Sequence, residues 1–225
     1  MFFSMTDILL LAPALILTLY AQYKVKSTFA KMSQVRAASG MTGAKVAQNL
    51  LLRNNITDVK VEAVEGNLTD HYDPVHKVLR LSSNVYASNS LAAIGVAAHE
   101  TGHAIQHKIA YGPLKLRQTM YPLANIGSTL AMPLFIIGLV VSFKPLLDIG
   151  IILFAAAVFF TLVTLPVEFD ASKRALAQLA SNGYVSSEEI GGAKRVLNAA
   201  ALTYVAAAAM AVLQLVRLLL IRGRD

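Results

Sequence analysis

Four long runs of residues without a charged side chain constrain the fold more than any other feature of the sequence. The runs cover residues 8–23, 120–143, 149–167 and 197–216. Because an α-helix rises about 1.5 Å per residue, each run can cross or nearly cross a hydrocarbon layer about 30 Å thick. The composition agrees, since 56% of the residues are hydrophobic and the mean hydropathy is +0.55. The sequence therefore predicts a mainly α integral membrane protein with about four transmembrane or membrane-embedded helices.

Basic residues follow the first apolar run at once. Lys24, Lys26 and Lys31 come after it, no basic residue precedes it, and no small-residue cleavage pattern ends it. We therefore expect a retained membrane anchor over residues 1–23 rather than a cleaved signal peptide. Because basic flanks mark the cytoplasmic side, the polar segment 24–118 is predicted to be cytoplasmic, in a multi-pass protein of the cell membrane.

The polar segment contains the sequence His-Glu-Thr-Gly-His at residues 99–103, which is an HExxH motif. Apolar residues 91–98 lead into it, and the serine and asparagine residues at 88–90 are suitable N-caps, so the motif is predicted to lie on a helix. Residues four apart share one face of a helix, and His99 and His103 can therefore direct ring nitrogens at one metal ion.

The cysteine count narrows the choice of further ligands. The chain has no cysteine, which excludes disulfides and thiolate ligands, so that histidine and carboxylate groups must hold the metal. We predict one Zn²⁺ per chain. Glu100 would then act as the general base that takes a proton from the water activated by zinc.

Glu168 is the candidate for the third ligand. The runs within residues 119–167 predict a transmembrane hairpin, which returns the chain to the side of the motif. Glu168 opens the polar segment 168–196 at that point. It either binds the metal or is only an interfacial charge at a helix end. Three other histidines are weaker candidates, because His71 and His76 lie in a turn-rich segment and His107 lies two turns beyond His99.

Two short segments before the motif alternate apolar and polar residues or are rich in branched side chains. Residues 59–64 and 78–81 are predicted to form partner strands. Residues 65–74 between them are rich in Gly, Asn, Asp and Pro, which is typical of an ordinary turn connection. Alternatively, this region, with Asp70, His71 and Tyr72, leads up to the metal helix and offers a strand edge to an extended peptide.

Four segments together resemble a known family. His-Glu-Thr-Gly-His at 99–103, Asp-His-Tyr-Asp-Pro at 70–74 and the segments 166–176 and 197–207 resemble the YugP-type membrane zinc metallopeptidases over nearly the whole chain. The chain is more distantly similar to the HtpX and CAAX prenyl protease gluzincins, which place an HExxH helix, a membrane hairpin and a ligand glutamate in this order. The resemblance implies a zincin-like α+β metallopeptidase domain, peptide or protein substrates, and Glu168 as third zinc ligand.

The chain also departs from the wider group. In that group the ligand glutamate opens an E-x-x-x-D pattern, whereas here Ser172 stands at the aspartate position. Asp170 is a possible substitute for that carboxylate. Tyr204, in the last apolar run, either supplies a hydroxyl group to the transition state or simply packs in its helix.

The C-terminal segment 197–225 combines an apolar run with a basic tail. If this run crosses the membrane, Arg217, Arg222 and Arg224 lie outside, against the usual distribution of charge. Either these late charges do not set the topology, or the helix packs into the protein without crossing.

Other functions remain as alternatives. An intramembrane protease of the site-2 kind would use an aspartate ligand such as Asp148, and a membrane scaffold would use zinc only structurally. Structural zinc normally has four protein ligands, and the sequence offers three good candidates. The net charge of +7 does not indicate nucleic-acid binding, because the basic residues flank apolar runs in the pattern of a membrane surface. The expected partners are a peptide or protein substrate and the lipid bilayer.

Overall fold

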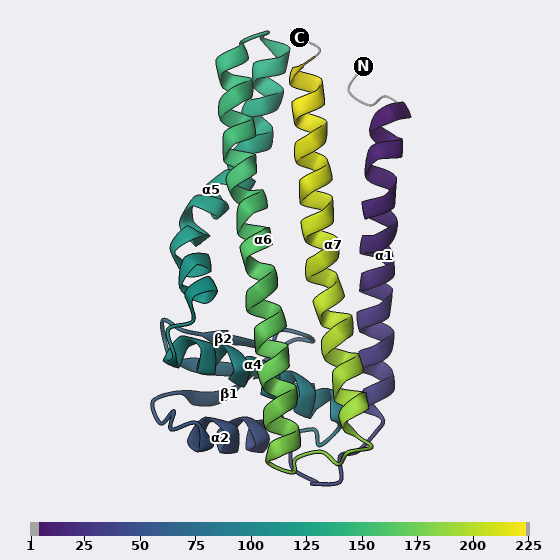
Figure 1. Cartoon of the computed structure of the whole chain (residues 1–225), viewed down its shortest axis with the longest axis vertical. Coiled ribbons are helices and arrows are strands. Elements are labelled where there is room, and N and C mark those ends of the chain that lie inside the picture. The colour runs from purple at the N-terminus through teal and green to yellow at the C-terminus, as the bar shows by residue number, and fades with distance from the viewer. Residues whose placement is uncertain (1–4, 224–225) are drawn as a thin grey trace. The chain divides into compact units, whose positions relative to one another are not determined.

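The computed structural model describes residues 5–223 of the chain (Figure 1). Residues 1–4 of the predicted anchor and residues 224 and 225 of the predicted tail lie outside this range. The described elements are, in chain order, α1 (Met5–Ser33), α2 (Gly43–Arg53), β1 (Lys60–Val64), β2 (His71–Asp73), β3 (Val78–Ser82), α3 (Ser83–Tyr86), α4 (Leu91–Lys108), α5 (Gly112–Val140), α6 (Lys144–Ser181) and α7 (Ile190–Arg222). The described chain is therefore mostly helical with one small sheet.

Four of these helices, α1, α5, α6 and α7, are long and apolar enough to cross a membrane. Between 11% and 28% of the most apolar stretch of each helix is buried within the protein. Most residues of these stretches are therefore not buried inside the protein, as expected where lipid replaces water as the solvent. The prediction of about four membrane-capable helices is confirmed.

The chain forms two compact units. We call one the membrane unit, which comprises Met1–Gln22, Lys115–Pro166 and Thr203–Asp225. The other, the motif unit, comprises Tyr23–Leu114 and Val167–Leu202. Helices α6 and α7 each contribute residues to both units, and the HExxH motif lies in the motif unit.

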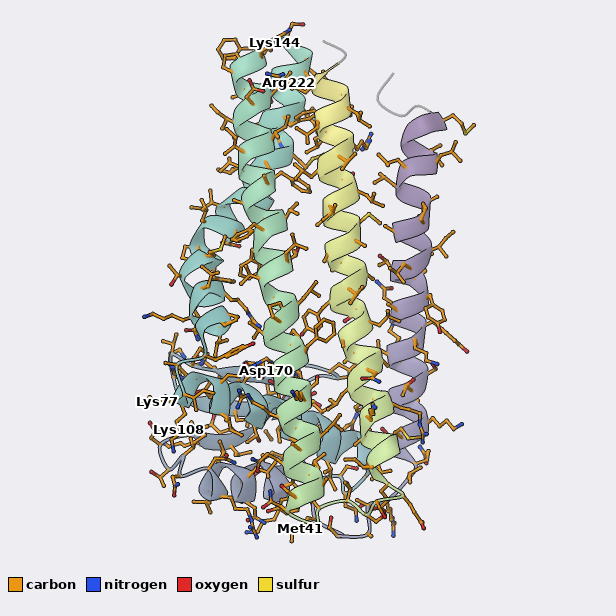
Figure 2. All side chains as sticks on the ribbon, in the orientation of Figure 1. Met41, Lys77, Lys108, Lys144, Asp170 and Arg222 are labelled. Atoms are coloured by element: carbon orange, nitrogen blue, oxygen red, sulfur yellow. The ribbon has the colours of Figure 1, made fainter. Side chains whose placement is uncertain are left out.

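Close helix packing characterises the membrane unit. A Cβ atom added to Gly150 of α6 would lie 2.9 Å from the carbonyl oxygen of Ala131 in α5, so glycine lets the two backbones touch. Near the end of α7, Arg222 donates to Asp148 of α6 over 3.0 Å. Figure 2 shows Arg222 and Lys144 near the same end of this unit.

The motif unit is built around α4. Ser90 caps this helix by accepting a hydrogen bond from the backbone N–H of Ala93 over 3.2 Å. Two apolar clusters pack against α4, and both include residues of α2 and α4. Residues of the HExxH motif are therefore held on a helix that is buried along most of its length.

The sheet has the order β1-β3-β2, with β1 parallel and β2 antiparallel to the central strand β3. Lys60 of β1 pairs with Val78 of β3, and His71 of β2 pairs with Arg80. The predicted partner strands therefore pair with each other. The segment 65–74, whose composition is typical of a turn, also contains β2, which forms one edge of the sheet among the described residues.

Candidate metal centre

Helices α4 and α6 approach each other closely at Gly102, inside the HExxH motif. A Cβ atom at this position would lie 2.7 Å from the backbone oxygen of Ala171. Because glycine has no Cβ, the two backbones can come into contact at this point. The motif histidines of α4 therefore lie next to the turn of α6 that begins at Glu168.

Three side chains meet where these helices touch. One carboxylate oxygen of Glu168 (Oε2) lies 3.2 Å from Nε2 of His99 and 3.6 Å from Nε2 of His103. The candidate ligand atoms of the three residues all lie within 4.8 Å of one another. Neighbouring ligand atoms on a tetrahedral zinc ion are about 3.3–3.6 Å apart when the metal bonds are about 2.0–2.2 Å. Two of the observed separations match this spacing.

The three side chains are shielded from water, with exposed fractions of 12% for His99, 11% for His103 and 3% for Glu168. A buried carboxylate between two imidazoles requires a positive partner. Burial works against a charged His103, but its interaction with Glu168 and the charge of Glu100 raise the pKa of this imidazole above its usual value. The negative charges of Glu168 and Glu100, which favour a proton on His103, also favour a divalent cation beside it. The donor set therefore fits zinc.

Glu100 follows His99 directly and is 8% exposed. It is not a member of the three-residue ligand group. Its carboxylate is thus a buried acid next to His99 in the chain, and its role as general base stays a prediction.

Each motif histidine also has a polar partner at its other ring nitrogen. Nδ1 of His99 lies 3.1 Å from the hydroxyl oxygen of Ser172, and Nδ1 of His103 lies 3.0 Å from Oε1 of Gln106. Ser172 is one turn beyond Glu168 and so shares its face of α6. Ser172, which stands at the aspartate position of the E-x-x-x-D pattern, thus contacts a candidate ligand histidine. Asp170 contacts Gln106 over 2.8 Å and is labelled on α6 in Figure 2.

Sequence reasoning missed Gln106 and assigned no role to Ser172. Gln106 is fully buried, and its position three residues after His103 on the same helix is the one signal that could have indicated the contact. For Ser172 the signal was its position four residues after Glu168.

The candidate substrate residues on and before β2 have different surroundings. Asp70 accepts hydrogen bonds from the backbone N–H and the hydroxyl of Ser82, and burial raises the pKa of its carboxyl group. His71 is exposed, and Tyr72 contacts Nδ1 of His107 through its hydroxyl group over 2.8 Å. Tyr72 therefore joins β2 to α4 one turn beyond His103.

The remaining histidines do not belong to the ligand group, and the role of Tyr204 at the transition state stays a prediction. Among residues 5–223, the group of His99, His103 and Glu168 is the one set of three metal-binding side chains within reach of a single ion. Tyr204 lies on α7 in the membrane unit and is 38% exposed.

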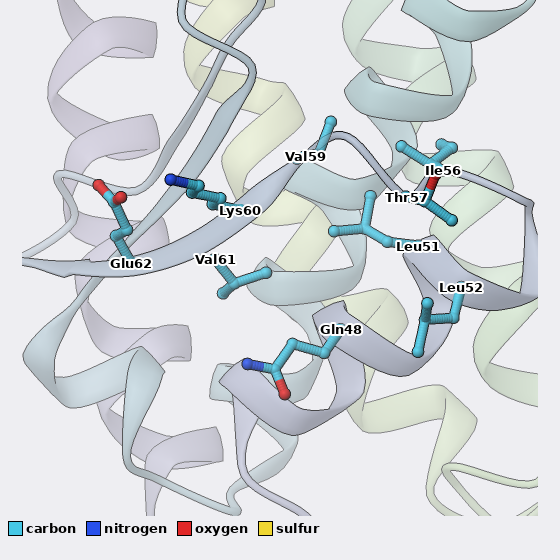
Figure 3. A pocket seen from close by; sticks show the side chains of 9 residues that line it. All are labelled: Gln48, Leu51, Leu52, Ile56, Thr57, Val59, Lys60, Val61 and Glu62. Atoms are coloured by element: carbon cyan, nitrogen blue, oxygen red, sulfur yellow. The ribbon is translucent and has the colours of Figure 1, made fainter.

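One groove of the motif unit lies along β1 and α2 (Figure 3). It has a volume of about 460 Å³ and is lined mainly by apolar side chains, including Leu51, Leu52 and Val61. It contains none of the three candidate ligands. A second cavity of about 360 Å³ is lined by Tyr72, Ala104 and His107 and so reaches the motif helix. Cavity size alone therefore does not locate the metal centre.

Comparison with known proteins agrees with this chemistry. Residues 7–223 match the family described as "Putative neutral zinc metallopeptidase", and the chain belongs to this family. It is also 50% identical over 223 residues to "Putative membrane protease YugP" of Bacillus subtilis (strain 168), a match that covers 98% of this chain and 99% of the relative. No solved structure matches the chain. The resemblance to the YugP-type family and the prediction of zinc as cofactor are confirmed.

Proposed function

We propose that the protein is a membrane-embedded zinc metalloendopeptidase whose active site faces the cytoplasm. The observation that carries this proposal is the buried group of His99, His103 and Glu168, contributed by two helices. The family and the membrane protease from Bacillus subtilis support a protease function. The HExxH helix, the sheet and the ligand glutamate support a zincin-like arrangement within the motif unit.

In this proposal Nε2 of His99, Nε2 of His103 and the carboxylate of Glu168 hold the metal. Bound zinc lowers the pKa of a water molecule to about 7 and polarises the carbonyl group that is attacked. Three protein ligands leave one of four tetrahedral positions for water or substrate, which is typical of catalytic sites and not of structural ones. This ligand count favours an enzyme over a scaffold.

Glu100 is the group that transfers the proton of the attacking water. Its buried carboxylate takes a proton from the attacking water and then delivers it to the nitrogen of the leaving amine. Because Glu100 does not belong to the ligand group, it can change its protonation state without releasing the metal.

The substrate is proposed to bind as an extended strand. Among the described residues β2 pairs only with β3, so its other edge can pair with a peptide backbone. Tyr72 of β2 contacts α4 at His107, and Asp70 secures the chain just before this strand by binding Ser82. The edge is therefore fixed relative to the motif helix.

The intramembrane alternative receives less support. Asp148, its candidate ligand, pairs with Arg222 within the membrane unit.

The test is to purify the protein in detergent and measure zinc content and cleavage of unstructured casein for three forms. We expect about one zinc per chain and cleavage in the wild type. Glu100→Gln should keep zinc and lose cleavage, and Glu168→Ala should lose both. Full activity of Glu100→Gln would refute the base, and unchanged zinc in Glu168→Ala would refute the ligand.

A further inference from the structure

Gln106 is a buried side chain between the two helices that supply the candidate ligands. Its exposed fraction is 0%, and its amide contacts groups on both α4 and α6. Building on the proposed zinc site, we propose that Gln106 is a positioning residue that sets the tautomer of His103 and fixes the distance between α4 and α6 at the metal.

The orientation of the Gln106 amide follows from its neighbours. Its nitrogen lies 2.8 Å from the carbonyl oxygen of Val167 and 2.8 Å from Oδ2 of Asp170. Both of these atoms accept hydrogen bonds and cannot donate them, so the NH₂ group must point to them. The oxygen of the amide therefore points to His103.

This orientation determines which nitrogen of His103 carries the proton. Oε1 of Gln106 can only accept, and it lies 3.0 Å from Nδ1 of His103, so the neutral imidazole donates from Nδ1. The lone pair is then on Nε2, the atom that faces Glu168 at 3.6 Å. A metal ligand needs its lone pair in this place, and of the two neutral tautomers the amide favours this one.

The same amide joins the two ligand-bearing helices. Val167, whose carbonyl oxygen accepts from Gln106, immediately precedes Glu168 in α6. Asp170 is held in turn by Arg174, whose Nε donates to it over 2.6 Å. Gln106 therefore joins α4 to α6 through Val167 and Asp170.

The test compares variants of the full-length protein in detergent. Gln106→Met keeps the volume but removes every hydrogen bond of the amide. We expect about 10- to 100-fold weaker zinc binding, the usual effect of losing a partner of a ligand histidine. Gln106→Glu should bind zinc at least as weakly, because a carboxylate oxygen would face the two acceptors to which the NH₂ group of Gln106 donates.

A double variant that restores the hydrogen bond between residues 106 and 170 shows whether Gln106 positions its neighbours or only fills space. The pair Gln106→Glu with Asp170→Asn exchanges the amide and the carboxylate, so residue 170 can donate to residue 106, which still accepts from His103. We expect this double variant to recover part of the zinc affinity lost in Gln106→Glu alone.

Thr101→Val is the matched control. Thr101 is also fully buried in α4, but its hydroxyl donates to the carbonyl oxygen of Ala97 within the same helix. We expect its zinc affinity to equal that of the wild type.

The readouts are zinc affinity by competition with a chelator, the visible spectrum of the Co²⁺ form, and thermal unfolding of the metal-free protein. Weak zinc binding with little change in metal-free unfolding, together with rescue, supports the inference. Wild-type affinity in Gln106→Met, or no rescue, overturns it. A wild-type protein that binds no zinc would instead refute the proposed function, so the two failures are distinguishable.

Discussion

Helix α6 contributes residues to both units, and the polar side chains of its two parts have different hydrogen-bond partners. In residues 144–166, within the membrane unit, the hydroxyl groups of Thr161 and Thr164 donate to carbonyl oxygens of their own helix. In residues 167–181, within the motif unit, Glu168 and Ser172 reach the histidines of α4. A helix in lipid satisfies its polar groups internally, whereas a helix in a folded domain can use them to build a site between helices.

Both parts nevertheless depend on glycine for close contact. Gly102 of α4 faces the backbone of Ala171 in the motif unit, and Gly150 of α6 faces the backbone of Ala131 in the membrane unit. The two contacts are sterically alike, but only the first lies beside the candidate metal centre. Alanine substitutions at these two glycines therefore give the strongest test of the comparison between the two parts of α6.

Gly102→Ala and Gly150→Ala should both lower the melting temperature of the protein in detergent. The new Cβ atoms would lie 2.7 Å and 2.9 Å from backbone oxygens, and such overpacking costs about 1–3 kcal/mol. Only Gly102→Ala should also lower the zinc content, because it separates the helices that carry the ligands. The measurements are thermal unfolding and metal analysis.

Gly191→Ala is the control for this pair. A Cβ atom on Gly191 has no neighbour within 4 Å, and helix propensity favours alanine by up to about 1 kcal/mol. Its melting temperature should be unchanged or slightly higher. Zinc loss in Gly150→Ala as well would show that the two parts of α6 are not independent.

Ser172→Ala should have an intermediate effect. It removes the hydroxyl group beside Nδ1 of His99, which we expect to weaken zinc binding about 10-fold. Ser172→Asp should retain the affinity, because a carboxylate at this position also accepts from Nδ1. Chelator competition measures both, and equal affinity of the alanine variant and the wild type would remove Ser172 from the site.

Asp148→Asn should have the smallest effect. Its pair with Arg222 is exposed, with exposed fractions of 43% and 48% for the two side chains, and exposed ion pairs contribute little to stability. We expect a slight fall in melting temperature at low salt that disappears at high salt, and an unchanged zinc content. A loss of zinc would instead support a role for Asp148 at the metal.

Much of the fold could be predicted because its signals are local. An uncharged run of about 20 residues identifies a membrane-capable helix by itself. Three of the four runs lie wholly in such helices, and the run 120–143 does so as far as Val140. Spacing within the motif predicted a helix with both histidines on one face. Strand β2 was harder to predict, because its three residues lie in a segment whose composition is typical of turns.

The partners of the histidines could not be predicted in the same way. Ser172 is 73 residues from His99 in the sequence, and a single serine carries no sign of the atom that it will contact. Asp170 was considered as a carboxylate partner, and the structure connects it to His103 through Gln106.

The sequence by itself determined the membrane-capable helices, the residue types of the metal centre and the absence of thiolate ligands. These properties depend on local hydrophobicity, helical spacing and composition. Only the tertiary structure decided that Glu168 lies beside both histidines and that Ser172 and Gln106 hold their other nitrogens. The reason is that a contact between two helices depends on how closely their backbones approach each other. At Gly102 the close approach to α6 is possible because glycine has no Cβ atom.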